Sequence, residues 1–181
     1  LHHLDPVALD DPVHHVLPFE HAPEDAELAL EMGGGARGDE ELAALGADVT
    51  LLSRSADSLE KVVASLPRTH GAQKHGYIAA DMNVHAALRA QVEAVANNGA
   101  VNILINNTGG PPGGRALDAE AEGFLDAFHK HLLANQALVK AVVPGMQGAQ
   151  WGRIVNVISK SVKEPIVNLG VSNTIRGAVA R

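Results

Sequence analysis

The segment that decides the fold is VNILINNTGGPPGG, residues 101–114. It opens with an aliphatic run, Val101–Ile105, and continues at once into asparagine, threonine, glycine and proline. A short apolar run bounded by turn residues is typical of a strand that is buried on both faces. The segment therefore predicts a buried strand that ends in a loop of small residues.

Strand and helix patterns alternate on both sides of this segment. The expected strands, from aliphatic and β-branched runs, are Ala47–Leu52, Tyr77–Ala80, Val101–Ile105 and Arg153–Ile158. The expected helices, from apolar residues at helical spacing, are Ser58–Leu66, Val84–Asn97, about Asp118–Val143, ended by Pro144-Gly145, and one that begins near Ser172. This alternation predicts βαβ units, and hence an α/β fold with a doubly wound parallel sheet. Ligands of such sheets bind at the carboxyl ends of the strands.

The first 31 residues differ from the rest of the chain. They are rich in proline, histidine and acidic residues, and no period of 2 or 3.6 persists in them. We therefore expect residues 1–31 to be a loosely ordered arm that contributes no strand to the sheet. In AELALEM, residues 26–32, glutamates and a methionine stand where a buried strand needs apolar residues. The paired histidines of the arm have no fixed ligand geometry, so we assign no metal site.

Composition excludes several classes of function. A chain of 181 residues with 46% hydrophobic and 19% charged residues suits one globular domain. The formal net charge is −7 and lysine and arginine are not clustered, so we expect no nucleic-acid partner. No apolar run approaches the roughly 20 residues that span a bilayer, so we expect no membrane partner. The absence of cysteine excludes disulfides and thiolate chemistry and fits a cytoplasmic location.

Four segments, in this order and spacing, resemble the short-chain dehydrogenase/reductase family and its 3-oxoacyl-carrier-protein reductase-like members. They are GADVTLLSR (46–54), AADM (79–82), ILINNTGG (103–110) and IVNVIS (154–159). The resemblance implies a partial Rossmann-type dinucleotide-binding domain over residues 32–181, irregular at its N-terminus and incomplete at its C-terminus. It also implies an NADP cofactor, a small carbonyl substrate, and a homo-oligomer that packs through the 118–143 helix.

The resemblance places cofactor-binding residues at the ends of the strands. Those positions hold Ser53, Arg54, Asp81, Met82, Asn107 and Gly109, with Gly34 and Gly38 in the phosphate-binding loop. The guanidinium of Arg54 suits a ribose 2′-phosphate and favours NADP(H), although a solvated surface charge is the alternative interpretation. The phosphate loop departs from the family, because Glu40 stands at the third glycine position and the helix that follows is too short.

The catalytic positions depart from the family as well. Ser159 matches the catalytic serine, Ser172 and Arg176 stand at the tyrosine and lysine positions, and His131 stands at the asparagine position. A serine hydroxyl is a much poorer acid than a phenol with a pKa of about 10. His131 or Lys163 is an alternative acid. The resemblance implies an NADP(H)-dependent reductase of a 3-oxoacyl thioester or similar carbonyl. The alternative is a catalytically impaired relic that acts as a nucleotide-binding or partner-binding module.

Overall fold

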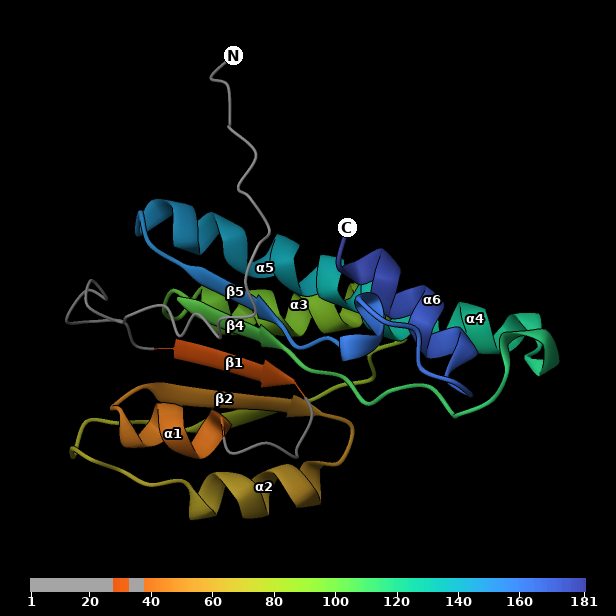
Figure 1. The fold of residues 1–181 in the computed structure, drawn as a ribbon. Coiled ribbons are helices and arrows are strands. Elements are labelled where there is room, and N and C mark those ends of the chain that lie inside the picture. Colours follow the sequence, from red (N-terminus) through yellow and green to blue (C-terminus); the bar gives the residue numbers. More distant parts are fainter. Residues whose placement is uncertain (1–27, 33–37) are drawn as a thin grey trace.

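The computed structural model describes residues 28–32 and 38–181, which form a five-stranded, wholly parallel sheet (Figure 1). The strands are β1 (Leu28–Met32), β2 (Asp48–Ser53), β3 (Gly76–Ala79), β4 (Ile103–Asn106) and β5 (Arg153–Asn156). Their order across the sheet is β3-β2-β1-β4-β5. The chain therefore winds outward from β1 to β3, and then returns to build β4 and β5 on the other side of β1. This is the doubly wound topology that the sequence predicts.

Helices cover both faces of this sheet, because successive side chains of a strand point to opposite faces. On β2, Val49 and Leu51 are buried with α1 (Gly38–Ala44) and α2 (Ala56–Ser65). Leu52, the next residue, is buried with α3 (His85–Ala96) and α5 (Ala134–Gly148) in the larger core. Figure 1 shows α1 and α2 on one side of the sheet and α3 and α5 on the other.

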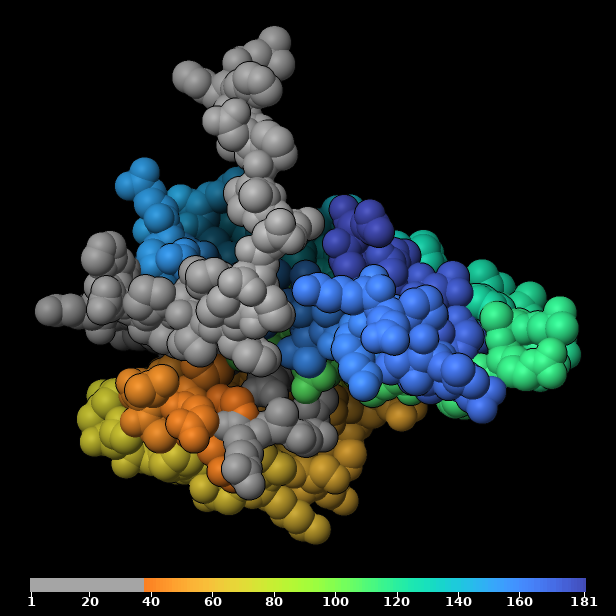
Figure 2. Space-filling model, in the orientation of Figure 1, coloured from red at the N-terminus to blue at the C-terminus, as the bar shows by residue number. Residues whose placement is uncertain are grey.

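A third, smaller cluster lies beyond the carboxyl ends of β4 and β5. It joins α4 (Ala121–Phe128) to α6 (Gly170–Val179), and its buried members are Ala127, Val171 and Ile175. Single 3₁₀ turns lead into these helices at Ala116–Asp118 and Lys160–Val162. In Figure 2 the segment after β5 (blue) lies against the segment before α4 (green). The two segments are joined by the backbone bond from Gly114 N–H to the carbonyl of Asn168. No helix within the described segments is long and apolar enough to cross a membrane.

The prediction that residues 1–31 contribute no strand is wrong at the end of that segment. Leu28–Met32 pairs in parallel with residues 48–52 of β2, and residues 29–31 pair with 103–105 of β4. Backbone N–H and C=O groups pair regardless of the side chains they carry, and pairing on two sides outweighs the weak apolar pattern of these residues. Residues 1–27, including the paired histidines, lie outside the described residues.

The helix expected over about Asp118–Val143 is built in three parts, and Pro144-Gly145 does not end it. One turn of π-helix, His129–Leu133, separates α4 from α5, and α5 continues through Pro144 to Gly148. A proline removes one hydrogen bond from a helix, whereas Val142 and Met146 on either side of it stay buried against the core. Tertiary packing therefore holds the helix across the proline.

The buried face of α5 should carry much of the stability. Replacing Leu138, which is fully buried, with alanine should lower the free energy of unfolding by about 2–5 kcal/mol, because the truncated side chain leaves a cavity. The matched control is Leu125→Ala on α4, where the leucine is 57% exposed and the expected change is within about 0.5 kcal/mol. Urea unfolding of both variants measures the difference, and equal losses would contradict the assigned core.

Candidate functional site

A pocket of about 320 Å³ lies at the carboxyl ends of β2, β3 and β4. Its lining residues come from the end of β2, from the loops after these strands and from the start of the π-helical turn: Leu52, Ser53, Arg54, Asp81, Met82, Asn107, Thr108, Gly109, Gly110 and Lys130. The pocket brings together six of the eight residues expected to bind a cofactor, namely Ser53, Arg54, Asp81, Met82, Asn107 and Gly109. Gly38 is the first residue of α1 and is not among the lining residues, and Gly34 lies outside the described residues.

Arg54 reaches the pocket because the chain turns sharply between β2 and α2. β2 ends at Ser53, and Ser55 caps α2 by accepting a hydrogen bond from the backbone N–H of Ser58. Arg54 is the single residue between them, and it is exposed at the rim of the pocket. On the other side, a Cβ placed on Gly109 would meet no described atom within 4 Å. Packing therefore leaves open space beside this glycine, in the same pocket as an exposed positive charge.

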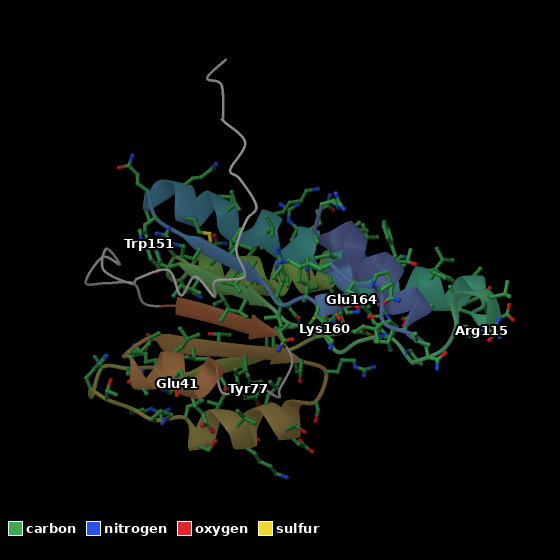
Figure 3. The ribbon with its side chains drawn as sticks, in the orientation of Figure 1. Glu41, Tyr77, Arg115, Trp151, Lys160 and Glu164 are labelled. Atoms are coloured by element: carbon green, nitrogen blue, oxygen red, sulfur yellow. The ribbon has the colours of Figure 1, made fainter. Side chains whose placement is uncertain are left out.

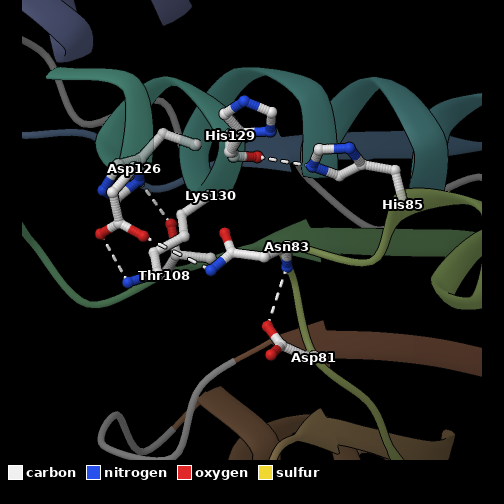
Figure 4. Close-up of polar contacts among 8 residues, drawn as sticks. Asp81, Asn83, His85, Thr108, Asp126, His129 and Lys130 are labelled. Carbon is white, nitrogen blue, oxygen red and sulfur yellow. Dashed lines mark hydrogen bonds and ion pairs between the residues drawn. The ribbon is translucent and has the colours of Figure 1, made fainter. Parts of the chain in front are cut away.

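A polar network supports the wall of the pocket (Figure 4). Asp81 accepts a hydrogen bond from the backbone N–H of Asn83 at 2.9 Å, and the side-chain amide of Asn83 contacts Asp126 at 3.4 Å. Lys130 donates to the same carboxylate at 2.6 Å, and this bond lowers the pKa of Asp126. The network therefore links the loop after β3 to α4 and fixes Lys130 at the pocket.

Sequence reasoning missed two lining residues, Lys130 and Leu52, whereas Thr108 and Gly110 belong to the segment after β4 where a site is expected. Lys130 lies on a helix, whereas the search was confined to residues that follow strands. The sequence feature that points to Lys130 is Asp126, four residues earlier on the same helical face. That signal alone predicts a surface ion pair and not a place in a pocket.

The four residues at the expected catalytic positions do not line this pocket. Ser159 accepts a hydrogen bond from the backbone N–H of Ser161 at 3.1 Å, and it begins the 3₁₀ turn after β5. Ser172 is buried on α6. The chain has one tyrosine, Tyr77 (Figure 3), and it lies on β3, at the opposite edge of the sheet from β5, the strand that leads to Ser159. Because position 172 holds a serine and Tyr77 lies elsewhere, no phenol is available as the catalytic acid.

Arg176 joins the carboxyl ends of β4 and β5. Its Nη1 donates to the carbonyl of Val157 at 2.8 Å, and its Nη2 donates to the carbonyl of Thr108 at 3.0 Å. Burial lowers the pKa of its guanidinium. Two of its donor nitrogens are thus engaged with the backbone, although the resemblance places Arg176 at the position of the catalytic lysine. In this conformation Arg176 acts as a link between two loops.

His131 is almost fully buried, with 2% of its surface exposed, and it lies in the π-helical turn. Its Nδ1 is 2.5 Å from the hydroxyl oxygen of Thr108. Burial lowers its pKa to about 4, and the charges of Arg176 and Lys130 act in the same direction. The imidazole is therefore neutral at pH 7 and is a poor source of a proton for catalysis. Lys163, the other alternative acid, is exposed and does not line the pocket.

The depressed pKa of His131 should make the stability of the fold depend on pH. The unfolded imidazole binds a proton near its ordinary pKa of 6.5, and the folded one binds it only near pH 4. Unfolding therefore takes up a proton between these values, and stability is lost as the pH falls through this window. Between pH 7 and pH 4 this contributes a loss of about 3 kcal/mol.

The measurement is urea unfolding at pH 7, 5 and 4 for the wild type and for His131→Asn, which has no titrating group at this position. The other histidines are the same in both proteins, so their contribution cancels in the comparison. The wild type should lose about 3 kcal/mol more than the variant over this range. Parallel pH profiles for the two proteins would contradict the burial of a neutral His131.

Comparison with known proteins agrees with this architecture. The model of the short chain dehydrogenase family matches residues 32–179, which is most of the chain. The 3-oxoacyl-acyl-carrier-protein reductase FabG of Pseudomonas aeruginosa is 30% identical over 134 residues, which cover 74% of this chain and 53% of that protein. The first three curated relatives are covered over 47%, 61% and 50% of their own length. The chain thus spans about half the length of the curated relatives it matches.

Solved structures give the same result. L-Sorbose reductase from Gluconobacter frateurii, complexed with NADPH and L-sorbose, superposes with a TM-score of 0.77 at 25% identity, over 84% of this chain and 60% of that one. A variant of actinorhodin polyketide ketoreductase with NADPH superposes with a TM-score of 0.76 at 26% identity, over 87% and 62%. The prediction of a Rossmann-type fold is thereby confirmed, and the chain belongs to the short-chain dehydrogenase family.

Proposed function

We propose that this chain binds NADP(H), with the adenosine end of the cofactor in the pocket after β2, β3 and β4. The observation that carries the proposal is this pocket, in which Arg54, Asp81 and the glycines after β4 lie together. Its volume of about 320 Å³ falls in the range of small-molecule sites, which is roughly 300–1,000 Å³. The guanidinium of Arg54 is complementary to a 2′-phosphate, and the carboxylate of Asp81 is an acceptor for the amino group of adenine.

The reaction that we propose is the reduction of a carbonyl, with a 3-oxoacyl thioester as the first candidate substrate. The support is similarity: the Pseudomonas relative is a 3-oxoacyl reductase, and the actinorhodin neighbour is a polyketide ketoreductase with NADPH. NADPH supplies a hydride when it is bound. This chain's own residues have to position the carbonyl and deliver a proton to its oxygen. Ser159 matches the family's serine, which positions the substrate.

The second candidate is a nucleotide-binding or partner-binding module with little catalysis of its own. Three features of the catalytic end favour it. Ser172 offers a hydroxyl where a phenol is expected, Arg176 is bound to two backbone carbonyls, and the buried His131 is neutral at pH 7. The partner surface that we propose for such a module is the helical region of residues 118–143, in a homo-oligomer.

Cofactor preference tests the proposed site. NADPH should bind more tightly than NADH, and Arg54→Ala should remove most of this preference, a loss of about 1.5–3 kcal/mol for charge-assisted hydrogen bonds. The control is Arg68→Ala, which removes an exposed arginine that does not line the pocket. Titration of NADPH and NADH fluorescence with the three proteins measures the two dissociation constants. Equal affinity of the wild type for both cofactors would contradict the role of Arg54.

Turnover tests the catalytic end. We expect little or no oxidation of NADPH with a short 3-oxoacyl thioester, because general acid catalysis is typically worth about 10²–10⁴ in rate and no phenol is available. The measurement compares the wild type with Ser159→Ala, and both should remain near the background rate. Robust turnover that collapses in the variant would show this expectation to be wrong, and would make a carbonyl reductase the first function of the chain.

A further inference from the structure

Thr108 lines the pocket and forms hydrogen bonds with both His131 and Arg176. Its hydroxyl oxygen lies 2.5 Å from Nδ1 of His131, and its carbonyl accepts a hydrogen bond from Nη2 of Arg176 at 3.0 Å. The same residue lines the proposed cofactor pocket. A polar side chain of the pocket is therefore fixed through its hydroxyl and through its backbone by two residues behind it.

The surroundings of His131 indicate which way the hydrogen bond to Thr108 runs. In a neutral imidazole one ring nitrogen carries a proton and the other accepts. The Nε2 atom of His131 is buried and has no hydrogen-bond partner among residues 28–32 and 38–181. A buried N–H without an acceptor is rarer in proteins than a buried acceptor without a donor. The favoured tautomer therefore carries its proton on Nδ1 and donates it to the hydroxyl oxygen of Thr108.

We propose that the hydroxyl of Thr108 donates its own proton into the pocket, to an oxygen that NADPH and NADH share. A hydroxyl that accepts from His131 keeps its O–H free for another partner. A ribose or phosphate oxygen of the nucleotide is the acceptor that this site would meet. His131 and Arg176 are then positioning residues, which orient a ligand-binding hydroxyl without touching the cofactor. This inference rests on the proposed binding of NADP(H).

Dissociation constants of NADPH and NADH, from fluorescence titration, test the proposal. Thr108→Val keeps the shape of the side chain and removes the hydroxyl, so both cofactors should bind about three- to tenfold more weakly, with their ratio unchanged. Thr108→Ser retains the hydroxyl and should bind like the wild type. The matched control is Thr174→Val on α6, which removes a hydroxyl that bonds to the carbonyl of Gly170 and should leave both constants unchanged.

Two variants of His131 test the positioning. His131→Leu removes the donor and should reproduce the loss seen in Thr108→Val. His131→Asn retains an N–H near the place of Nδ1 and should bind both cofactors nearly as well as the wild type. Both substitutions break the same hydrogen bond, between His131 and Thr108. The double variant Thr108→Val, His131→Leu should therefore bind no more weakly than either single variant. A merely structural role for His131 would instead give additive losses.

The outcomes separate this inference from the function on which it rests. A wild type that binds neither cofactor would overturn both. If the wild type binds NADPH and Thr108→Val binds it equally well, the inference alone is overturned. The inference is also overturned if Thr108→Val changes the ratio of NADPH to NADH affinity, because the hydroxyl would then contact the 2′-phosphate. Should His131→Leu fail to fold, the comparison of Thr108→Val with Thr108→Ser still decides the question.

Discussion

The structure depends on the backbone pairing of β1 with two neighbours at once. β1 pairs with β2 along one edge and with β4 along the other. It therefore lies between β2 and β3 on one side and β4 and β5 on the other. A doubly wound sheet opens a crevice at its carboxyl end where the strand order reverses. The loops after β2, β3 and β4 converge on that end because all three strands run the same way. The pocket is a consequence of topology before any side chain is considered.

Side chains then divide this end of the sheet into two unlike regions. Over β2, β3 and β4 the loops leave a pocket whose charged groups, Arg54, Asp81 and Lys130, come from three separate elements. Over β4 and β5 the guanidinium of Arg176 ties the loops together through two backbone carbonyls. The first region is an open pocket lined by charged and polar groups. In the second region a residue at a catalytic position is already bound within the protein.

Sequence patterns predicted the strands that carry a regular apolar run. They missed the features that depend on backbone pairing or on a single helical turn. β2 to β5 were found within two residues at each end, because buried strands impose an apolar run that is bounded by turn residues. β1 was missed because Glu31 and Met32 break that run, while its pairing depends only on the backbone. The contact of Thr108 with His131 was missed for a different reason. It depends on one turn of π-helix, and no period of apolar residues encodes a single wider turn.

Membership of the family fixes the fold more firmly than the chemistry, because chemistry depends on a few side chains placed on that fold. At two of the positions where this chain departs from the family pattern, the new residues act on each other. Burial lowers the pKa of His131, the charge of Arg176 lowers it further, and both residues form a hydrogen bond with Thr108. Residues that share a partner are energetically coupled, so a change at one alters the effect of a change at the other. Restoring a lysine at position 176 alone would release Thr108 and Val157 without supplying a phenol. The departures therefore form a connected set, in which a neutral imidazole and a bound guanidinium stabilise the loop after β4.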